Sequence, residues 1–224
     1  MKPKLHAADL FIILIIALPF IYLAYVFKNL PATVPTHFGH NGQADGFSSK
    51  NKLWLILLIT AGISMLIYLL MRFLPNIDPK KTAKYSAPAF NKIAVAVVLL
   101  LCAINFSIIS AAQSGAFKFF KIFPVVMGLF FAFMGNIMHS IKPNYFAGIR
   151  TPWTLESEET WRLTHQLGGK LWFFGGIIIA GVSLFIPEKI APYFMMGCIF
   201  ILAIVPVVYS YTTYKSIQKR DKKS

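Results

Sequence analysis

The chain is poor in charged side chains, above all in acidic ones. Only 13% of its 224 residues are charged, and eight Asp and Glu stand against 22 Lys and Arg. A soluble domain carries about 25% charged residues, so this composition argues against a soluble protein. The only two cysteines lie in apolar runs, which excludes a disulfide framework or a cysteine-based metal site. We expect no metal and no cofactor.

Long apolar runs dominate the chain instead. Runs of this length are typical of transmembrane helices. Lipid cannot hydrogen-bond backbone N–H and C=O groups, so a membrane-spanning segment must pair them within itself, as a helix does. Strands of a membrane barrel would alternate apolar and polar side chains, whereas these runs are apolar on all sides. We therefore predict an all-α membrane protein, a bundle of six transmembrane helices. The predicted spans are residues 8–27, 53–73, 93–113, 122–139, 171–186 and 190–214.

The distribution of basic residues predicts the topology. Most of the 22 Lys and Arg fall on one side when six spans are threaded, and basic loops stay in the cytoplasm. Both termini and loop 140–170 are then cytoplasmic, and loop 28–52 is extracellular. We expect a multi-pass protein of a cell membrane.

Four regions follow from this threading. They are an N-terminal membrane region, a segment with the third span, a C-terminal membrane region and a basic tail that anchors on anionic lipid. Their bounds are 1–75, 76–121, 122–214 and 215–224. The basic connection 75–91 is expected to be a solvated linker. A Gly176-x-x-x-Ala180 pattern predicts a helix-packing face in the fifth span.

The extracellular loop is predicted to be compact, because Asn41-Gly42 and Asp45-Gly46 are turn dipeptides. His37 and His40 with Asp45 could ligate a metal, but His-x-x-His alone is weak evidence and structural roles are favoured. The residues expected to meet an extracellular ligand are His37, Asn41, Gly42, Asp45, Gly46 and Lys50.

The cytoplasmic loop is predicted to contain a short interfacial helix between the fourth and fifth spans. Thr151-Pro152 suits a helix N-terminus. Trp161 and His165 share a face by their spacing, and Gly168-Gly169 would end or bend the helix. This segment either tethers two spans or docks a cytosolic partner. Candidate partner-binding residues are Lys142, Pro143, Asn144, Arg150, Thr151, Pro152, Trp153, Trp161, His165 and Lys170.

The same segment resembles the signature of the SdpI family of bacterial immunity proteins. The resemblance rests on residues 135–136, 141–146, 148–155, 159, 161, 164–165 and 169–170. The extracellular loop separately resembles the small domain that commonly precedes that signature, through residues 35–38, 42, 45–46 and 49–50. Gly39 and His40 depart from that domain's usual residues, which weakens a metal role.

This resemblance implies an integral membrane immunity protein that gives resistance to a secreted toxic peptide. It also implies signal transduction, by sequestering a cytosolic transcriptional repressor at the membrane. The implied partners are the lipid bilayer, the toxin and the repressor, without direct binding of nucleic acid.

Two other classes remain open from the residues alone. A small peptide or ion transporter, or an exporter, would normally need ionisable groups in mid-membrane or an inverted repeat, and neither is evident. A membrane enzyme would need a nucleophile elbow, a His-Glu-x-x-His motif or paired carboxylates. None of these occurs, so we predict that the protein is not an enzyme.

Overall fold

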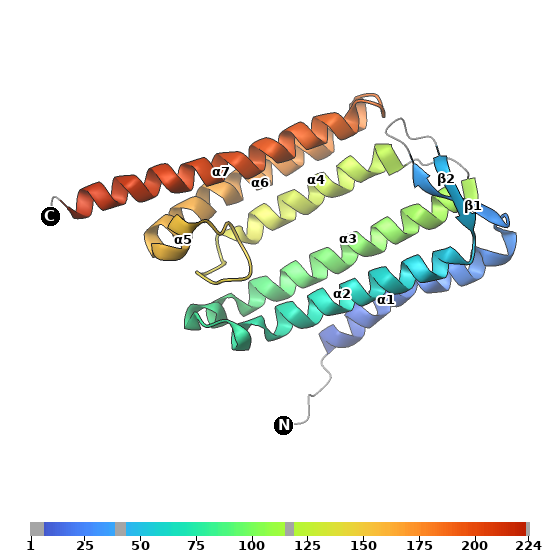
Figure 1. Ribbon diagram of the computed structural model, residues 1–224, viewed down its shortest axis with the longest axis horizontal. Helices are drawn as coiled ribbons and strands as arrows, with labels where there is room; N and C mark the ends of the chain where they lie inside the picture. Colours follow the sequence, from blue (N-terminus) through green and yellow to red (C-terminus); the bar gives the residue numbers. More distant parts are fainter. Residues whose placement is uncertain (1–6, 39–43, 115–118, 223–224) are drawn as a thin grey trace, which may run out of the picture. The chain divides into compact units, whose positions relative to one another are not determined.

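The computed structural model describes residues 7–38, 44–114 and 119–222, and about 80% of it is helical (Figure 1). Two antiparallel strands and two 3-10 turns complete the elements. In chain order the elements are α1 (Ala7–Val26), η1 (Phe27–Asn29), β1 (Thr33–Phe38), β2 (Ala44–Ser49), α2 (Lys52–Ile77), η2 (Lys81–Ser86), α3 (Ala87–Ser114), α4 (Phe119–Met138), α5 (Pro152–Glu156), α6 (Glu158–Phe185) and α7 (Ala191–Asp221).

The helical membrane architecture predicted from the apolar runs is confirmed. Within the described residues, five helices are long and apolar enough to cross a bilayer, namely α1, α2, α3, α6 and α7. The sixth predicted span corresponds to α4, which carries a shorter apolar stretch, Ile122–Met138.

The prediction of an all-α fold is wrong for the segment between α1 and α2, which forms a β-hairpin. Thr33 pairs with Ser49 and Phe38 with Ala44, with irregular register on either side of His37. In β2, half-buried and exposed residues alternate, as they do in a strand with one covered face. Sequence reasoning used the prolines and turn dipeptides of this segment to predict a compact loop, because the residues of the two strands do not alternate in polarity.

The described residues divide into two compact units. The first comprises Met1–Leu69 with Val95–Phe123, and the second comprises Leu70–Ala94 with Pro124–Ser224. The first unit has a fully buried apolar cluster in which Val34 of the hairpin packs with side chains of α1, α2 and α3. The amine of Lys50 donates hydrogen bonds to the carbonyl oxygens of Phe27 and Leu30, each at 3.0 Å, and so ties β2 to the end of α1.

Small residues bring α4 and α6 into backbone contact in the second unit. A Cβ at Gly176 would lie 2.4 Å from the backbone nitrogen of Ala132, and one at Gly135 would lie 2.3 Å from that of Phe173. Gly128 faces Ala180 in the same way, at 2.5 Å. In a membrane, such close approach supplies the dispersion contacts that hold helices together. The packing face predicted from Gly176-x-x-x-Ala180 is therefore present.

The prediction of a separate interfacial helix between the fourth and fifth spans is wrong. Residues 158–168 form the first turns of α6, which continues through Gly168 and Gly169 to Phe185. Only the five-residue α5 stands apart, because the Ser157 side chain starts a new helix by accepting a hydrogen bond from the Thr160 amide. The two glycines do not end the helix, since their missing side chains admit Met138 and the backbone of α4.

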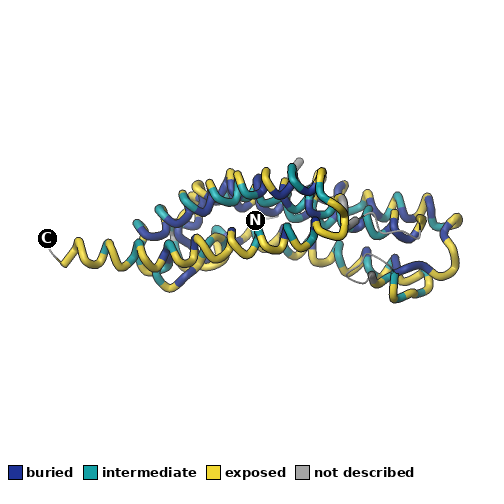
Figure 2. Tube along the Cα trace, turned by 90° about the horizontal axis from the view of Figure 1, so that it is seen from above, coloured by how far each residue is buried: buried dark blue, intermediate teal, exposed yellow. Residues whose placement is uncertain are grey.

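Exposure along the helices agrees with a membrane protein. Exposed positions recur along the long helices (Figure 2). They include large apolar side chains on every long helix, whereas the last turns of α7 expose mainly polar and basic residues. Lipid would cover the first surface and water the second.

Candidate functional site

The segment between α4 and α6 is held in one shape by a buried asparagine. The Asn144 amide nitrogen donates to the carbonyl oxygens of Lys142 and Ala147, both at 2.9 Å. Its side-chain oxygen accepts from the backbone amides of Phe146 and Ala147 at 2.8 and 2.7 Å. Every polar atom of this side chain is used, so Asn144 acts as the internal brace of the loop.

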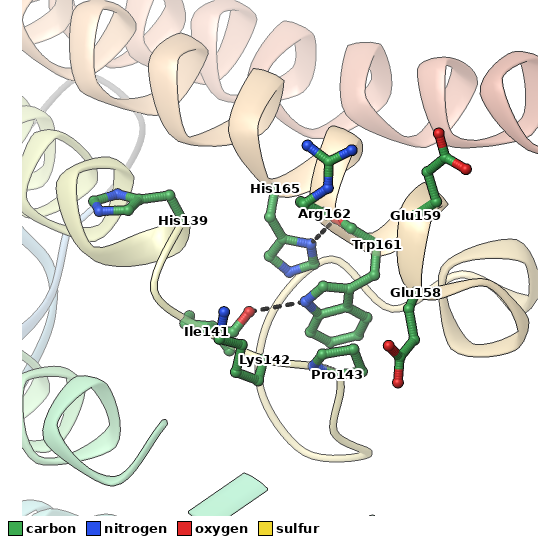
Figure 3. A pocket seen from close by; sticks show the side chains of 9 residues that line it. All are labelled: His139, Ile141, Lys142, Pro143, Glu158, Glu159, Trp161, Arg162 and His165. Atoms are coloured by element: carbon green, nitrogen blue, oxygen red, sulfur yellow. Dashed lines mark hydrogen bonds between the residues drawn. The ribbon is translucent and has the colours of Figure 1, made fainter. Parts of the chain in front are cut away.

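His165 holds the far side of the same loop (Figure 3). Its Nε2 accepts a hydrogen bond from the backbone amide of Ile149 at 3.0 Å, and Nδ1 lies 2.9 Å from the carbonyl oxygen of Trp161. An acceptor Nε2 and a carbonyl-facing Nδ1 together require a neutral ring with its proton on Nδ1. The ring is 1% exposed and stacks on the Trp161 indole at 4.1 Å between centroids.

Gly148 allows this arrangement. Its φ of 111° is a backbone conformation that residues with a side chain rarely adopt. A Cβ there would also lie 2.4 Å from Nε2 of His165. Trp161 completes the brace, because its indole nitrogen donates to the Ile141 carbonyl at 2.8 Å. The loop therefore rests on a Trp–His platform at the start of α6.

Thr151 caps α5, as the sequence predicts. Its hydroxyl oxygen accepts from the Thr154 amide at 3.2 Å, and the Thr154 hydroxyl accepts in return from the Thr151 amide at 2.9 Å. This reciprocal pair is a capping box. The Thr151 hydroxyl also lies 3.1 Å from that of Ser210, which links the loop to α7.

The connection between α2 and α3 is not the solvated linker expected from its lysines. Asp78 is 8% exposed and accepts hydrogen bonds from the amides of Tyr145 and Lys80, at 2.8 and 2.7 Å. The Lys80 amine donates to the Leu155 carbonyl at 2.7 Å. Thr82 and Ser86 add further bonds to the loop. A single acid among lysines, Asp78 before Pro79, was the available sequence signal.

Burial separates the ten predicted partner-binding residues into two groups. Five are buried inside the loop and its platform, so they shape the surface without presenting it. These are Pro143, Asn144, Thr151, Trp161 and His165. Trp153 is half-buried against Tyr211 of α7. The exposed ones are Lys142, Arg150, Pro152 and Lys170, of which Arg150 donates a hydrogen bond to the Tyr145 carbonyl at 2.6 Å.

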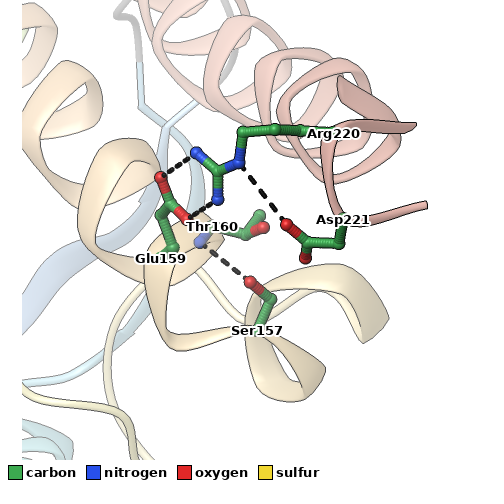
Figure 4. Close-up of polar contacts among 5 residues, drawn as sticks. All are labelled: Ser157, Glu159, Thr160, Arg220 and Asp221. Atoms are coloured by element: carbon green, nitrogen blue, oxygen red, sulfur yellow. Dashed lines mark hydrogen bonds and ion pairs between the residues drawn. The ribbon is translucent and has the colours of Figure 1, made fainter. Parts of the chain in front are cut away.

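A cavity of about 440 Å³ lies at the start of α6 (Figure 3). Its lining includes His139 and Lys142 beside Glu158, Glu159 and Arg162. Glu159 is also held by a two-pronged ion pair with Arg220 of α7, at 2.7 and 3.3 Å (Figure 4). This pair ties the basic end of α7 to the mouth of the cavity.

The hairpin brings His37 and Asp45 together in the first unit. Nδ1 of His37 lies 2.5 Å from a carboxylate oxygen of Asp45, with 75% and 52% of the two side chains exposed. Gly46 lies opposite His37 and leaves room for it, since a Cβ there would be 2.8 Å from that of His37. Asn41, Gly42 and His40 lie outside the described residues. Across the described ranges, no three His, Cys, Asp or Glu gather in a way that could hold a metal.

Both regions match known families. Residues 140–210 match the model of the SdpI/YfhL protein family, and residues 14–61 match a domain of unknown function, DUF1648. The chain is also similar to "Immunity protein SdpI" of Bacillus subtilis (strain 168), with 27% identity over 205 residues. That match covers 92% of this chain and 95% of the relative. No solved structure matches the chain.

The apolar helices and these matches define a multi-pass protein of the cell membrane. Its resemblance to the SdpI family, predicted from the residues alone, is confirmed. The Bacillus subtilis relative is named as an immunity protein. The family region contains the loop, its Trp–His platform, and α5, α6 and most of α7.

Proposed function

We propose that this protein is an immunity protein that gives its cell resistance to a secreted toxic peptide. The observation that carries the proposal is the match to the Bacillus subtilis immunity protein, because it runs over 92% of this chain. Both the hairpin region and the loop with its platform fall within families, so the resemblance is not confined to apolar spans.

The proposed topology has six spans with both termini in the cytoplasm. α4 counts as a span, because its 20 residues rise about 30 Å at 1.5 Å per residue, the thickness of a bilayer core. The excess of Lys and Arg in loop 140–170, connection 75–91 and the tail favours the cytoplasmic side for these segments.

The hairpin is the proposed contact for the toxin. In this topology it is the longest extracellular segment, and its strands give it a fixed shape. Phe47 is 61% exposed beside the His37–Asp45 pair, which offers an apolar and a polar contact on one small surface. The Lys50 amine is engaged by two carbonyls, so Lys50 supports the hairpin from within.

The loop between α4 and α6 is the proposed cytoplasmic output, which would hold a repressor at the membrane. Lys142, Arg150 and Lys170 expose cations on a rigid base, and rigid bases present binding residues at low entropic cost. Trp161 and His165 take part only by holding that base.

The test compares resistance conferred on a toxin-sensitive strain by variants that reach the membrane in equal amounts. Phe47→Ala and His37→Ala should lower resistance, whereas Ser49→Ala, also exposed on β2, should keep it. Equal resistance in all three variants would contradict the hairpin assignment. If the unaltered chain gives no resistance to any toxic peptide secreted by the cells that naturally carry it, the immunity proposal is contradicted.

The output is tested separately, by the fraction of fluorescent repressor at the membrane after toxin addition. Arg150→Glu should reduce recruitment and keep resistance. Lys189→Glu, an exposed control in the α6–α7 connection, should reduce neither. Recruitment that survives charge reversal at Lys142, Arg150 and Lys170 together would contradict this site.

A further inference from the structure

A second cavity, of about 510 Å³, opens along the seam between α4 and α6. Its floor is the close contact of Gly135 with Gly169, where a Cβ on Gly169 would lie 2.9 Å from the Gly135 carbonyl oxygen. Because two glycines meet here, the helices leave a groove above their backbones. The walls are Asn136 of α4, His139 directly after α4, and Gln166, Lys170, Phe173 and Phe174 from α6.

The groove is polar at one end and apolar at the other. Gln166 and Lys170 precede the adjacent Phe173 and Phe174 on α6, and Gln166, Lys170 and Phe174 follow one another at four residues, about one helical turn. Phe174 is 61% exposed. Beyond it the same two helices expose large apolar side chains, at Leu129, Phe133, Ile177 and Ile178. The groove thus runs from the membrane–water boundary into the apolar part of the bilayer.

The polar side chains of the groove are unused by the protein. Within the described ranges, Asn136, His139, Gln166 and Lys170 make no side-chain hydrogen bond or ion pair. This contrasts with the neighbouring loop, where the polar atoms of Asn144 and His165 are all engaged. Four free donors around one groove offer bonds to a ligand.

The charge of the groove favours an anion. Lys170 is the one fixed charge in its lining, and His139 is shared with the 440 Å³ cavity, which adds Lys142 and Arg162. That cavity also holds two acids, but Glu159 is neutralised by Arg220. Glu158 lies about 18 Å from Lys170 along the helix axis, at 1.5 Å per residue.

We propose that the α4–α6 groove binds one anionic phospholipid of the adjoining leaflet. Its phosphate lies between Lys170 and His139, Asn136 and Gln166 hydrogen-bond the headgroup, and an acyl chain lies over Phe173 and Phe174. A phospholipid matches all three properties at once: negative charge at the boundary, hydrogen-bond acceptors beside it, and a chain that points into the bilayer. The groove shares Lys170 with the proposed cytoplasmic output, whereas its other lining residues lie outside that output surface and outside the hairpin.

Native mass spectrometry of the full chain in mild detergent tests the site, with added dioleoyl phosphatidylglycerol or dioleoyl phosphatidylcholine. One phosphatidylglycerol should be retained per chain, and phosphatidylcholine should bind more weakly. Lys170→Gln should weaken phosphatidylglycerol binding about fivefold, the contribution of one basic residue near anionic lipid. Lys189→Gln removes an exposed lysine outside the groove and should leave binding unchanged.

Phe174→Ala tests the apolar end against Phe185→Ala, which removes a still more exposed ring outside the groove. Only Phe174→Ala should weaken retention, and helix content by circular dichroism should be equal in both. Equal binding of the two lipids, equal loss from Lys170→Gln and Lys189→Gln, or displacement of the lipid by a soluble acidic peptide would overturn the proposal.

Discussion

The backbone amide of Ile149 donates a hydrogen bond to Nε2 of His165, 3.0 Å away, and so fastens the loop between α4 and α6 to α6. The bond joins a residue before α5 to one well inside α6. A histidine that looks like a surface or catalytic group in the sequence is thereby a structural acceptor.

Replacing that acceptor should loosen the loop. His165→Phe keeps most of the ring volume but leaves the Ile149 amide without a partner. An unsatisfied buried amide costs about 1–3 kcal/mol. Thermal unfolding of purified protein in detergent should show a lower midpoint, and limited proteolysis should cut the loop sooner. His139→Phe, at an exposed histidine without such a bond, should change neither measurement.

Gly148→Ala should destabilise the same contact from the opposite side. The new Cβ meets Nε2 of His165, and a φ of 111° is strained for alanine. A residue held in such a conformation costs about 1–3 kcal/mol. Combined with His165→Ala, part of the penalty should disappear, because the clash is removed and only the backbone strain remains. Strict additivity of the two unfolding free energies would argue against direct contact.

Gly176→Ala should separate α4 from α6. The added methyl carbon would meet the backbone of Ala132 and Gly128, which cannot move aside as a flexible side chain can. We expect a loss of about 1–3 kcal/mol, as for overpacked interiors, measured by unfolding in detergent. Gly181→Ala in the same helix has open space around its Cβ, so it should be neutral or slightly stabilising. The prediction fails if both variants behave alike.

Arg220→Gln should have little effect on stability. Its ion pair with Glu159 is two-pronged, but 62% of the Arg220 side chain is exposed, so solvent screens the attraction. Exposed ion pairs contribute little to stability, because water and salt screen them. The difference from unaltered protein should shrink further as salt is raised, and Lys219→Gln should show no salt-dependent difference. A large loss at high salt would mean that Arg220 supports the fold in another way.

Local features could be predicted from the sequence because each depends on residues that are close together along the chain. The apolar runs predicted helical spans through bilayer chemistry alone, and Thr151-Pro152 predicted a helix start through backbone geometry. The small-residue pattern at Gly176 and Ala180 predicted a packing face. In each case the responsible interaction is with lipid, with residues close in sequence, or with any helix that approaches.

Contacts distant in sequence were not readable in the same way. Asp78 lies 67 residues before Tyr145, whose backbone amide donates to it, so the single acid among lysines was visible in the sequence but its partner was not. Glycine lowers the stability of a helix in water. Here α6 nevertheless continues through Gly168 and Gly169, because both pack closely on α4. That continuity turned a predicted surface helix into the first turns of a long one.

The sequence by itself determined that the chain is a helical membrane protein and that it resembles the SdpI family. Both follow from the polarity of each residue and from the spacing of motif residues, which do not depend on the folded structure. Only the tertiary structure decided which signature residues face outward. The loop is held by hydrogen bonds with the buried side chains of Trp161, His165 and Asn144. The exposed positions are Lys142, Arg150 and Lys170. The reason is physical: burial and hydrogen bonding depend on which helices come together, and that is settled only when the chain has folded.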